Sequence, residues 1–359
     1  MRRHRSTGGL AADCYMKKLY MLPVHFISVF TWAKSFRTNP FIGSYVLNLL
    51  GLHVIRVVVA QILFRFRLLL LSPLVPAEDR RQFLREGYIV KPNFLSAEQF
   101  DALSAELTGY EGDIREISEG NTGTQRLFLT REVRQALPEC ERLTRNPALD
   151  RLLRYTSSKN RPPFFFVENL KQHSGEAGER DPQKDFHMDT FHPCVKAWLY
   201  LDDVSENNGP FVYIPRSHRL TWERVKWEYR ESIKASRDKE SQEARYWDGS
   251  FRVSDDDRRR MGLSEPKVMN VPSNTLVLAN VRGFHCRGNA TGASSRLAIW
   301  MQARDNPFNP LFTPLPRMTA TLFEKVWDSH LKRVDREMAG SKARQVYHGQ
   351  FERFRGETG

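Results

Sequence analysis

The chain has 359 residues, a length that accommodates one large domain with an appendage or two modest domains. Its hydrophobic fraction of 40% is ordinary for a folded globular body and too low for a protein with many membrane-spanning segments. The formal net charge is +13, but residues 1–75 hold ten Lys and Arg against one acid, Asp13, and so supply +9 of it. This basic leader, residues 1–77, indicates an acidic surface as its partner.

Two apolar segments lie in the leader, Tyr20–Trp32 and Phe41–Phe64. The second has the ~20 residues that a spanning helix needs. However, Arg56 lies near its middle, where a charge costs about 2.5–3.5 kcal/mol on insertion scales. We therefore expect residues 20–75 to contact a membrane surface, lying in the interface or re-entrant. The alternative is an apolar helical hairpin packed on the folded body.

Two other interpretations of the leader are weaker. Met16, a second candidate start of the chain, precedes Lys17 and Lys18 as in a secretory signal, but no small-x-small cleavage site follows Trp32. The basic residues alternate with aliphatic runs instead of forming a compact cluster, so nucleic acid is an unlikely partner. The four cysteines show no CxxC spacing, which predicts reduced thiols and a cytoplasmic protein. They are Cys14, Cys140, Cys194 and Cys286.

A linker at Ser72–Pro76 separates the leader from the folded body. Ser96 and Gln99 form a capping-box signature that opens a helix with apolar residues at helical spacing. The other elements expected in this part are a helix at 78–86, a strand at 88–90, a helix at 142–155, a strand at 163–170 and a polar loop at 175–183.

Short strand signals multiply between Phe186 and Ala303. Val195–Leu201 alternates, so Lys196, Trp198 and Tyr200 are predicted to face the side opposite to the apolar residues between them. Further strands are expected at 211–214, 275–278 and 297–302, with a strong turn signal at 207–210. Many short strands with turns predict a mainly β body with flanking helices, a jelly-roll or cupin-like core (a double-stranded β-helix), over residues 78–310.

Two further segments complete the chain. Leu220–Arg260 is charged and rich in Trp, and we expect an insertion on the barrel rim, over residues 220–265. It is either a solvated face or a lid over a site. Residues 311–359 are expected to form a helical tail, with a charged helix at Thr319–Met338 and a polar basic end.

His187 and Asp189 are separated by one residue, so in an extended segment both side chains leave the same face. An imidazole and a carboxylate can then converge as two ligands of one metal ion. His285 is the best candidate for a third ligand, because two His and one carboxylate on one side of an iron ion leave positions open for a co-substrate and oxygen. His192 is an alternative ligand, although Pro193 predicts a turn there.

Arg296 follows His285 by eleven residues, on the strand face shared with Ala298 and Trp300. A buried guanidinium needs an acidic partner to offset its desolvation. A dicarboxylate that chelates the metal at one end can place its far carboxylate on Arg296 in a bidentate pair.

In motif order, residues 78–305 resemble the phytanoyl-CoA dioxygenase family of Fe(II)- and 2-oxoglutarate-dependent oxygenases. QFLREGYIVKPNFLSAEQFDAL is similar to the family's first strand and helix, and FHMDT resembles its WHQDT-like ligand strand. KAWLYLDDVSENNGPFVYIPRSH resembles the strand, the Asn-Gly turn and the Pro-x-Ser-His segment that follow. His285 and Arg296 stand at the family's spacing. The sequence departs from the family at Phe186, where Trp is common, and at Arg216, where Gly is usual.

The resemblance implies Fe(II), 2-oxoglutarate and O2 as cofactors, with iron ligands His187, Asp189 and His285. It implies that Arg296 binds the 2-oxoglutarate carboxylate and that Trp198 lies beside the co-substrate; the alternative for Trp198 is core packing. The implied reaction converts 2-oxoglutarate to succinate and carbon dioxide and hydroxylates an unactivated C–H bond. Relatives that halogenate have a small residue in place of the carboxylate, so Asp189 favours hydroxylation.

The leader leads us to expect a lipid or membrane-proximal organic substrate. Two alternatives remain open. One is a non-catalytic, membrane-tethered jelly-roll binding protein, which has no need of all four site residues. The other is a metal-dependent cupin isomerase or lyase, which has no need of Arg296.

Overall fold

The structure is a computed structural model that describes residues 20–159, 162–172, 181–241, 248–303, 305–312, 316–341 and 343–353. Cys14, the candidate start at Met16 and five of the ten basic leader residues lie outside the described residues, as does most of the predicted loop at 175–183.

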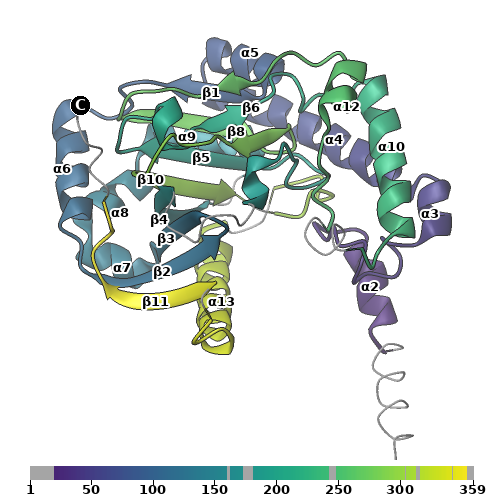
Figure 1. Cartoon of the computed structure of the whole chain (residues 1–359). Coiled ribbons are helices and arrows are strands. Elements are labelled where there is room, and N and C mark those ends of the chain that lie inside the picture. The colour runs from purple at the N-terminus through teal and green to yellow at the C-terminus, as the bar shows by residue number, and fades with distance from the viewer. Residues whose placement is uncertain are drawn as a thin grey trace, which may run out of the picture.

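The strands form two antiparallel sheets (Figure 1). They are β1 (Tyr88–Lys91), β2 (Gly112–Glu119), β3 (Thr122–Phe128), β4 (Phe164–Gln172), β5 (Val195–Tyr200), β6 (Phe211–Tyr213), β7 (Lys267–Val268), β8 (Thr275–Asn280), β9 (His285–Arg287), β10 (Ser294–Ala303) and β11 (Arg344–Gly349). The larger sheet has the order β1-β8-β5-β10-β4-β3-β2-β11 and the smaller one β7-β6-β9. The strands expected at 88–90, 163–170, 195–201, 211–214, 275–278 and 297–302 are all present, whereas β2 and β3 were not predicted.

One buried aromatic cluster joins the two sheets. Trp198 and Tyr200 of the larger sheet share it with Phe211 and Tyr213 of the smaller one, and the ring centroids of Trp198 and Phe211 are 4.7 Å apart. The sheets therefore pack face to face, as expected for a jelly-roll core. The alternation predicted for β5 is confirmed, since its apolar residues belong to a different cluster on the opposite face.

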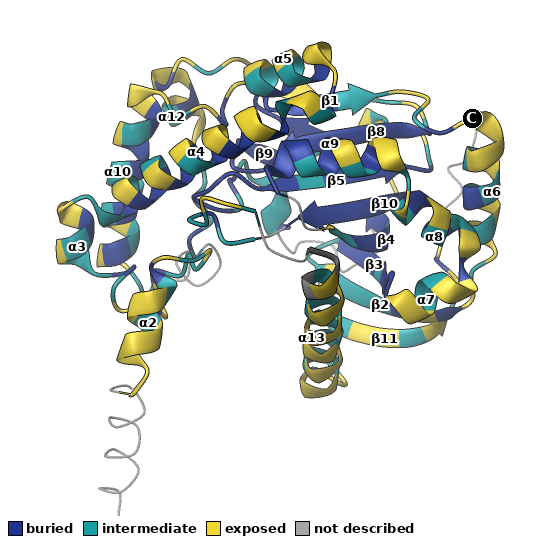
Figure 2. Cartoon of the chain, turned by 180° about the vertical axis from the view of Figure 1, so that it is seen from behind, coloured by how far each residue is buried: buried dark blue, intermediate teal, exposed yellow. Residues whose placement is uncertain are grey.

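Helices cover that opposite face of the larger sheet (Figure 2). They are α5 (Ala77–Glu86), α6 (Ala97–Thr108), α7 (Arg131–Ala136), α8 (Pro138–Thr144) and α9 (Pro147–Ser157). The predicted capping box of Ser96 and Gln99 opens α6. The single helix expected at 142–155 is wrong, because Asn146 caps a new helix with Pro147 at its first position.

The leader forms α2 (Leu22–Ser28), α3 (Tyr45–Leu49) and α4 (Leu52–Leu71), and the linker forms a 3-10 turn at Ser72–Leu74. One face of α4 packs on the body, with Phe64, Leu68 and Leu71 in the main core. This is the contact expected of a packed apolar hairpin. Among the described residues, no helix is both long and apolar enough to cross a membrane.

The rim insertion contains α10 (Trp222–Arg237) and α12 (Asp255–Arg260), and α10 packs against α3 and α4. The predicted tail helix is present as α13 (Pro316–Glu337). The tail also contains β11, which pairs with β2 at the sheet edge and was not expected from the polar sequence.

Arg216 marks a turn before Ser217 and His218. Its φ is 67°, in the left-handed region that favours glycine. The turn thus retains a glycine-like backbone with a side chain present, at a cost of about 1–2 kcal/mol.

Candidate active site

Backbone hydrogen bonds hold the HxD segment in place from both sides. His187 and His285 exchange N–H···O bonds of 2.9 Å in each direction, and Asp189 N donates to Val281 O at 3.0 Å. On the other side, Met188 N donates to Phe251 O at 3.1 Å. The segment is therefore extended between β9 and residues 251–252 of the rim insertion, which places His187 and Asp189 on one face.

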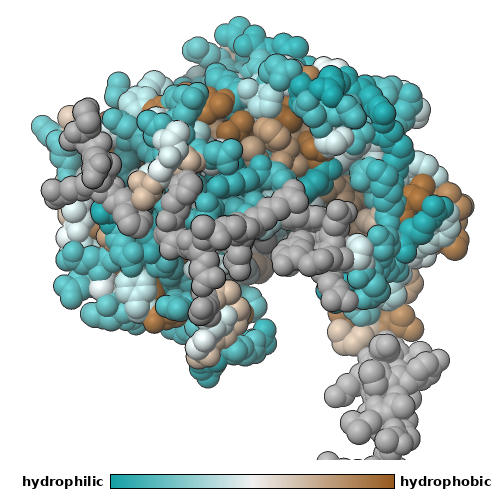
Figure 3. Space-filling model, viewed as in Figure 1, coloured by the Kyte–Doolittle hydropathy of each residue, from teal (hydrophilic) through white to brown (hydrophobic). Residues whose placement is uncertain are grey.

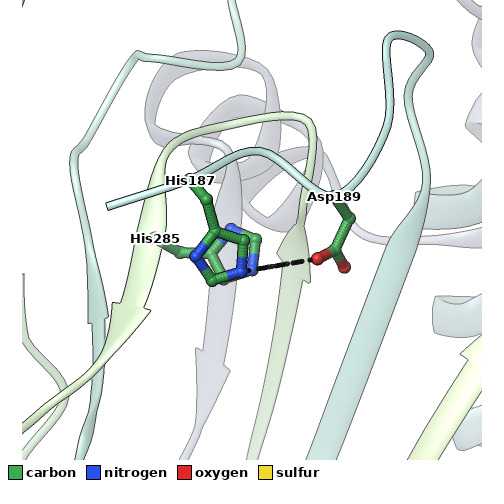
Figure 4. Close-up of side chains that lie close together, drawn as sticks. All are labelled: His187, Asp189 and His285. Carbon is green, nitrogen blue, oxygen red and sulfur yellow. Dashed lines mark ion pairs between the residues drawn. The ribbon is translucent and has the colours of Figure 1, made fainter. Parts of the chain in front are cut away.

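Three side chains converge at this point (Figure 4). Asp189 Oδ1 lies 3.6 Å from Nε2 of His187 and 3.6 Å from Nε2 of His285. Two metal–ligand bonds of about 2.1 Å span at most about 4.2 Å, so one ion can reach both atoms of each pair. The structure therefore brings together the three residues that the sequence selected.

Each imidazole is oriented through its other nitrogen. His187 Nδ1 lies 2.7 Å from Asp185 O, and His285 Nδ1 lies 2.9 Å from Gly283 O. A carbonyl oxygen only accepts, so Nδ1 carries the hydrogen in both rings and Nε2 presents a lone pair. Burial and the neighbouring His285 lower the pKa of His187 to about 4, which leaves this ring neutral near pH 7. The donor set of two imidazoles and one carboxylate fits Fe(II).

Lys196 was not singled out by the sequence, although β5 alternation placed it on the inner face. Its ammonium lies 2.7 Å from Asp189 Oδ2, which leaves Oδ1 directed at the histidines. Burial alone raises the pKa of Asp189, but Lys196 and the two imidazoles lower it well below its usual range. Asp189 is thus an anion at neutral pH.

A cavity of about 310 Å³ opens beside the triad and includes His187, His285, Trp198 and Arg296 in its lining. Arg296 is 7% exposed, and within the described part of the chain its Nη1 atom has no hydrogen-bond partner. A buried guanidinium atom without a partner in a cavity is suited to a carboxylate ligand. The aromatic wall near Arg296 consists of Trp198, Trp300 and Phe211.

Other charges in the same cavity are already paired. Arg126 Nη2 lies 2.8 Å from Glu168 Oε2, and Arg287 Nη1 lies 2.8 Å from Asp181 Oδ2. These pairs were not predicted, because their partners come from different strands and loops. Among the described residues, Arg296 is the cavity guanidinium that has a fully buried donor atom, Nη1, without a partner.

A fully buried ion network supports the loops on either side of the triad. Glu228 Oε1 accepts from Arg224 at 3.1 Å and from Arg282 at 3.0 Å, and Oε2 lies 2.9 Å from His53 Nε2. Arg282 also donates to Phe191 O at 3.1 Å, two residues after Asp189. Burial opposes ionisation, but the charge of Arg224, the hydrogen bond with His53 and the charge of Arg282 lower the pKa of Glu228 to about 2. The pair of Arg224 and Glu228, four residues apart on α10, is a local signal, but the contributions of Arg282 and His53 come from distant parts of the chain.

His192, the alternative ligand, lies apart from the triad. Its Nδ1 is 3.1 Å from Pro193 O, and it lines a different cavity, between the leader and the ligand segment. Cys194 and Cys286 are buried, and neither is part of a disulfide in the described part of the chain.

Residues 83–254 match the model of a protein family described as phytanoyl-CoA dioxygenase (PhyH). A curated protein of Stutzerimonas stutzeri, the "probable alpha-ketoglutarate-dependent hypophosphite dioxygenase", is 27% identical over 160 residues. That match covers 40% of this chain and 54% of the relative, so the chain spans about half the length of the curated relative it matches.

Two solved structures show a distant likeness. The non-heme alpha-ketoglutarate-dependent epimerase SnoN from nogalamycin biosynthesis is 15% identical, with a TM-score of 0.39 over 64% of this chain and 81% of SnoN. HygX from Streptomyces hygroscopicus, solved with nickel and 2-oxoglutarate bound, is 17% identical, with a TM-score of 0.39 over 64% of this chain and 86% of HygX.

Proposed function

We propose that this chain, whose residues 83–254 match the phytanoyl-CoA dioxygenase (PhyH) family model, is an Fe(II)- and 2-oxoglutarate-dependent dioxygenase of that family and hydroxylates an unactivated C–H bond of an organic substrate. One observation carries this proposal. Both triad histidines donate through Nδ1 to backbone carbonyls, so their Nε2 lone pairs and Asp189 Oδ1 face one point. His187, Asp189 and His285 are the iron ligands in this proposal.

Arg296 is the proposed partner of the far carboxylate of 2-oxoglutarate. Its Nη1 atom is buried without a hydrogen bond among the described residues, in the cavity that His187 and His285 also line. Trp198 forms part of the wall beside the co-substrate. When bound, iron and 2-oxoglutarate supply the oxidising power, as 2-oxoglutarate loses carbon dioxide to give succinate and one oxygen atom of O2 is added to the substrate.

The residues of the chain have the task of orientation. Lys196 fixes one oxygen of Asp189, and the Nδ1 hydrogen bonds fix both imidazole planes. The aromatic wall restricts water and places the C–H bond near the metal. A carboxylate ligand occupies the position at which a halide would need space, which supports hydroxylation.

The substrate class in this proposal is a lipid or another membrane-proximal molecule, oxidised at the cytoplasmic face of a membrane. The apolar, basic character of the leader supports a membrane-proximal substrate. The leader also lies beside the candidate site, since Lys34 Nζ is 2.7 Å from the backbone oxygen of Asp189. The absence of disulfides among the described cysteines, Cys140, Cys194 and Cys286, supports the reducing compartment.

Succinate release tests the chemistry. The full chain, loaded with Fe(II), is incubated with 2-oxoglutarate and ¹⁸O2 together with lipid extracts or water-soluble metabolites. The expected result is succinate in step with an ¹⁸O-labelled lipid product. A metal-loaded protein that consumes no 2-oxoglutarate with any fraction contradicts the proposal and favours the binding protein or the cupin lyase. Equally fast turnover of soluble metabolites contradicts the lipid substrate.

A further inference from the structure

Helix α4 has the reverse of the usual polarity of a surface helix. Apart from the exposed Arg65, its polar side chains face the protein. Arg56 is 4% exposed and donates to Val29 O at 2.8 Å, and Arg67 is 1% exposed and donates to Ser158 O at 3.1 Å. His53 is buried against Glu228. A helix on the surface of a water-soluble body normally turns such residues outward.

Apart from Arg65, the exposed side of α4 carries large apolar residues along the length of the helix. Leu69 is 72% exposed and Ile62 is 61% exposed. The exposed apolar residues recur at intervals of three or four, which aligns them on one side of the helix. They are Ile55, Val59, Ile62, Phe66, Leu69 and Leu70.

The same feature continues over α2 and α3, where the hydrophobic surface is visible in Figure 3. Phe26 and Ile27 of α2 and Val46 and Leu49 of α3 are exposed. In the described part of the chain, 17 of the 24 exposed large hydrophobic side chains lie between residues 20 and 70. Scattered exposed apolar residues are normal, but such a concentration marks an interaction surface. We call these outer faces of α2, α3 and α4 the leader face.

Charge indicates which partner the leader face fits. Residues 20–76 contain five basic residues and no acid, and two of them, Arg37 and Arg65, are exposed. A second copy of the chain would bring the same positive charge against itself. An anionic lipid surface complements both the charge and the apolar side chains.

We propose that the leader face docks on an anionic lipid bilayer, with α2, α3 and α4 in the interface rather than across it. The hydrogen bonds of Arg56 and Arg67 keep the inner face of α4 on the protein, so only the outer face meets lipid. A membrane-proximal substrate requires that the enzyme reach a lipid surface, so this proposal rests on the proposed function. Vesicle binding is nevertheless independent of iron chemistry, so the two can fail separately.

Co-sedimentation of the full chain with phosphatidylcholine vesicles, with and without phosphatidylserine, tests the proposal. The test variant is Ile62→Glu with Phe66→Glu, and the matched control is Trp222→Glu, an exposed aromatic residue on α10 outside the leader face. We expect binding only with phosphatidylserine, a loss of about tenfold or more in the test variant, and no change in the control.

Thermal unfolding and vesicle-free 2-oxoglutarate turnover show whether the variants remain folded and competent. Equal vesicle binding by wild type and test variant overturns the proposal, whatever the turnover. Absence of vesicle binding together with a dimer that the test variant dissociates also overturns it, since the leader face is then an interface between two copies. Loss of vesicle binding with unchanged turnover supports it, even if every lipid fails as a substrate.

Discussion

Lys34 of the leader donates a hydrogen bond from its ammonium to the backbone oxygen of Asp189, at 2.7 Å. Lys34 also bonds the hydroxyl of Ser250, which itself donates to Asp189 O at 3.0 Å. The leader is therefore joined to the candidate metal site by direct contact, not only by a linker.

Removal of this contact should loosen the metal site. We expect Lys34→Ala to weaken Fe(II) binding by about tenfold. Partners that hold a metal ligand in position typically contribute about 10–100-fold to metal affinity. Arg37→Ala, three residues away and exposed, is the control. Metal titration measures both, and equal affinities for the two variants would contradict this role of Lys34.

The ligand assignment can be tested against its own alternative. His187→Ala and Asp189→Ala should each lower Fe(II) affinity by more than about 100-fold, beyond the loss typical of outer partners. His192→Ala should retain metal, because His192 lies in a different cavity. Metal content after gel filtration decides, and metal loss in the His192 variant alone would transfer the assignment to that residue.

Arg296 should act on the co-substrate and not on the metal. Replacement by Gln removes a charge-assisted bidentate pair and should raise the KM for 2-oxoglutarate by about 10–100-fold, the equivalent of about 1.5–3 kcal/mol. Lys at this position should restore part of the affinity. Fe(II) affinity is the internal control, and a variant with an unchanged KM would remove Arg296 from the co-substrate site.

The buried ion network should control stability. Glu228→Gln leaves Arg224 and Arg282 without their counter-charge and should lower the free energy of unfolding by about 3–5 kcal/mol. Glu223, on the same helix, forms an exposed pair with Lys226, so Glu223→Gln should cost less than about 1 kcal/mol. Urea unfolding compares them; a similar small loss in both would show that the network is not a determinant of stability.

Acid sensitivity should involve His218. Burial, with the nearby arginines, lowers its pKa from 6.5 to about 3. Below pH 6.5 the unfolded chain therefore binds a proton that the folded chain does not, so stability falls as the pH decreases toward 3, by at most about 1.4 kcal/mol per pH unit from this group. Urea unfolding of His218→Leu should show a shallower decline between pH 6.5 and 4 than wild type. Parallel profiles would be inconsistent with this.

The sequence by itself determined the local chemistry of the candidate site. A period of two placed His187 and Asp189 on one face, and the same period placed Arg296 with Trp300 toward the cavity. The capping box at Ser96 and the alternation of β5 were equally local and equally predictable. Strands rich in polar residues, such as β2, β3 and β11, were missed because pairing in the sheet, rather than propensity, stabilises them.

Only the tertiary structure decided which side chains of the leader are exposed. Its apolar residues look alike in the sequence. Which of them face outward depends on where Arg56 finds carbonyl oxygens in the leader, such as that of Val29, and where Arg67 finds one on the body, at Ser158. Lys34 and Asp189 are 155 residues apart, and His53 and Glu228 are 175 apart. Such contacts follow from chain folding and not from local spacing, because hydrogen bonds and ion pairs depend on distance in space.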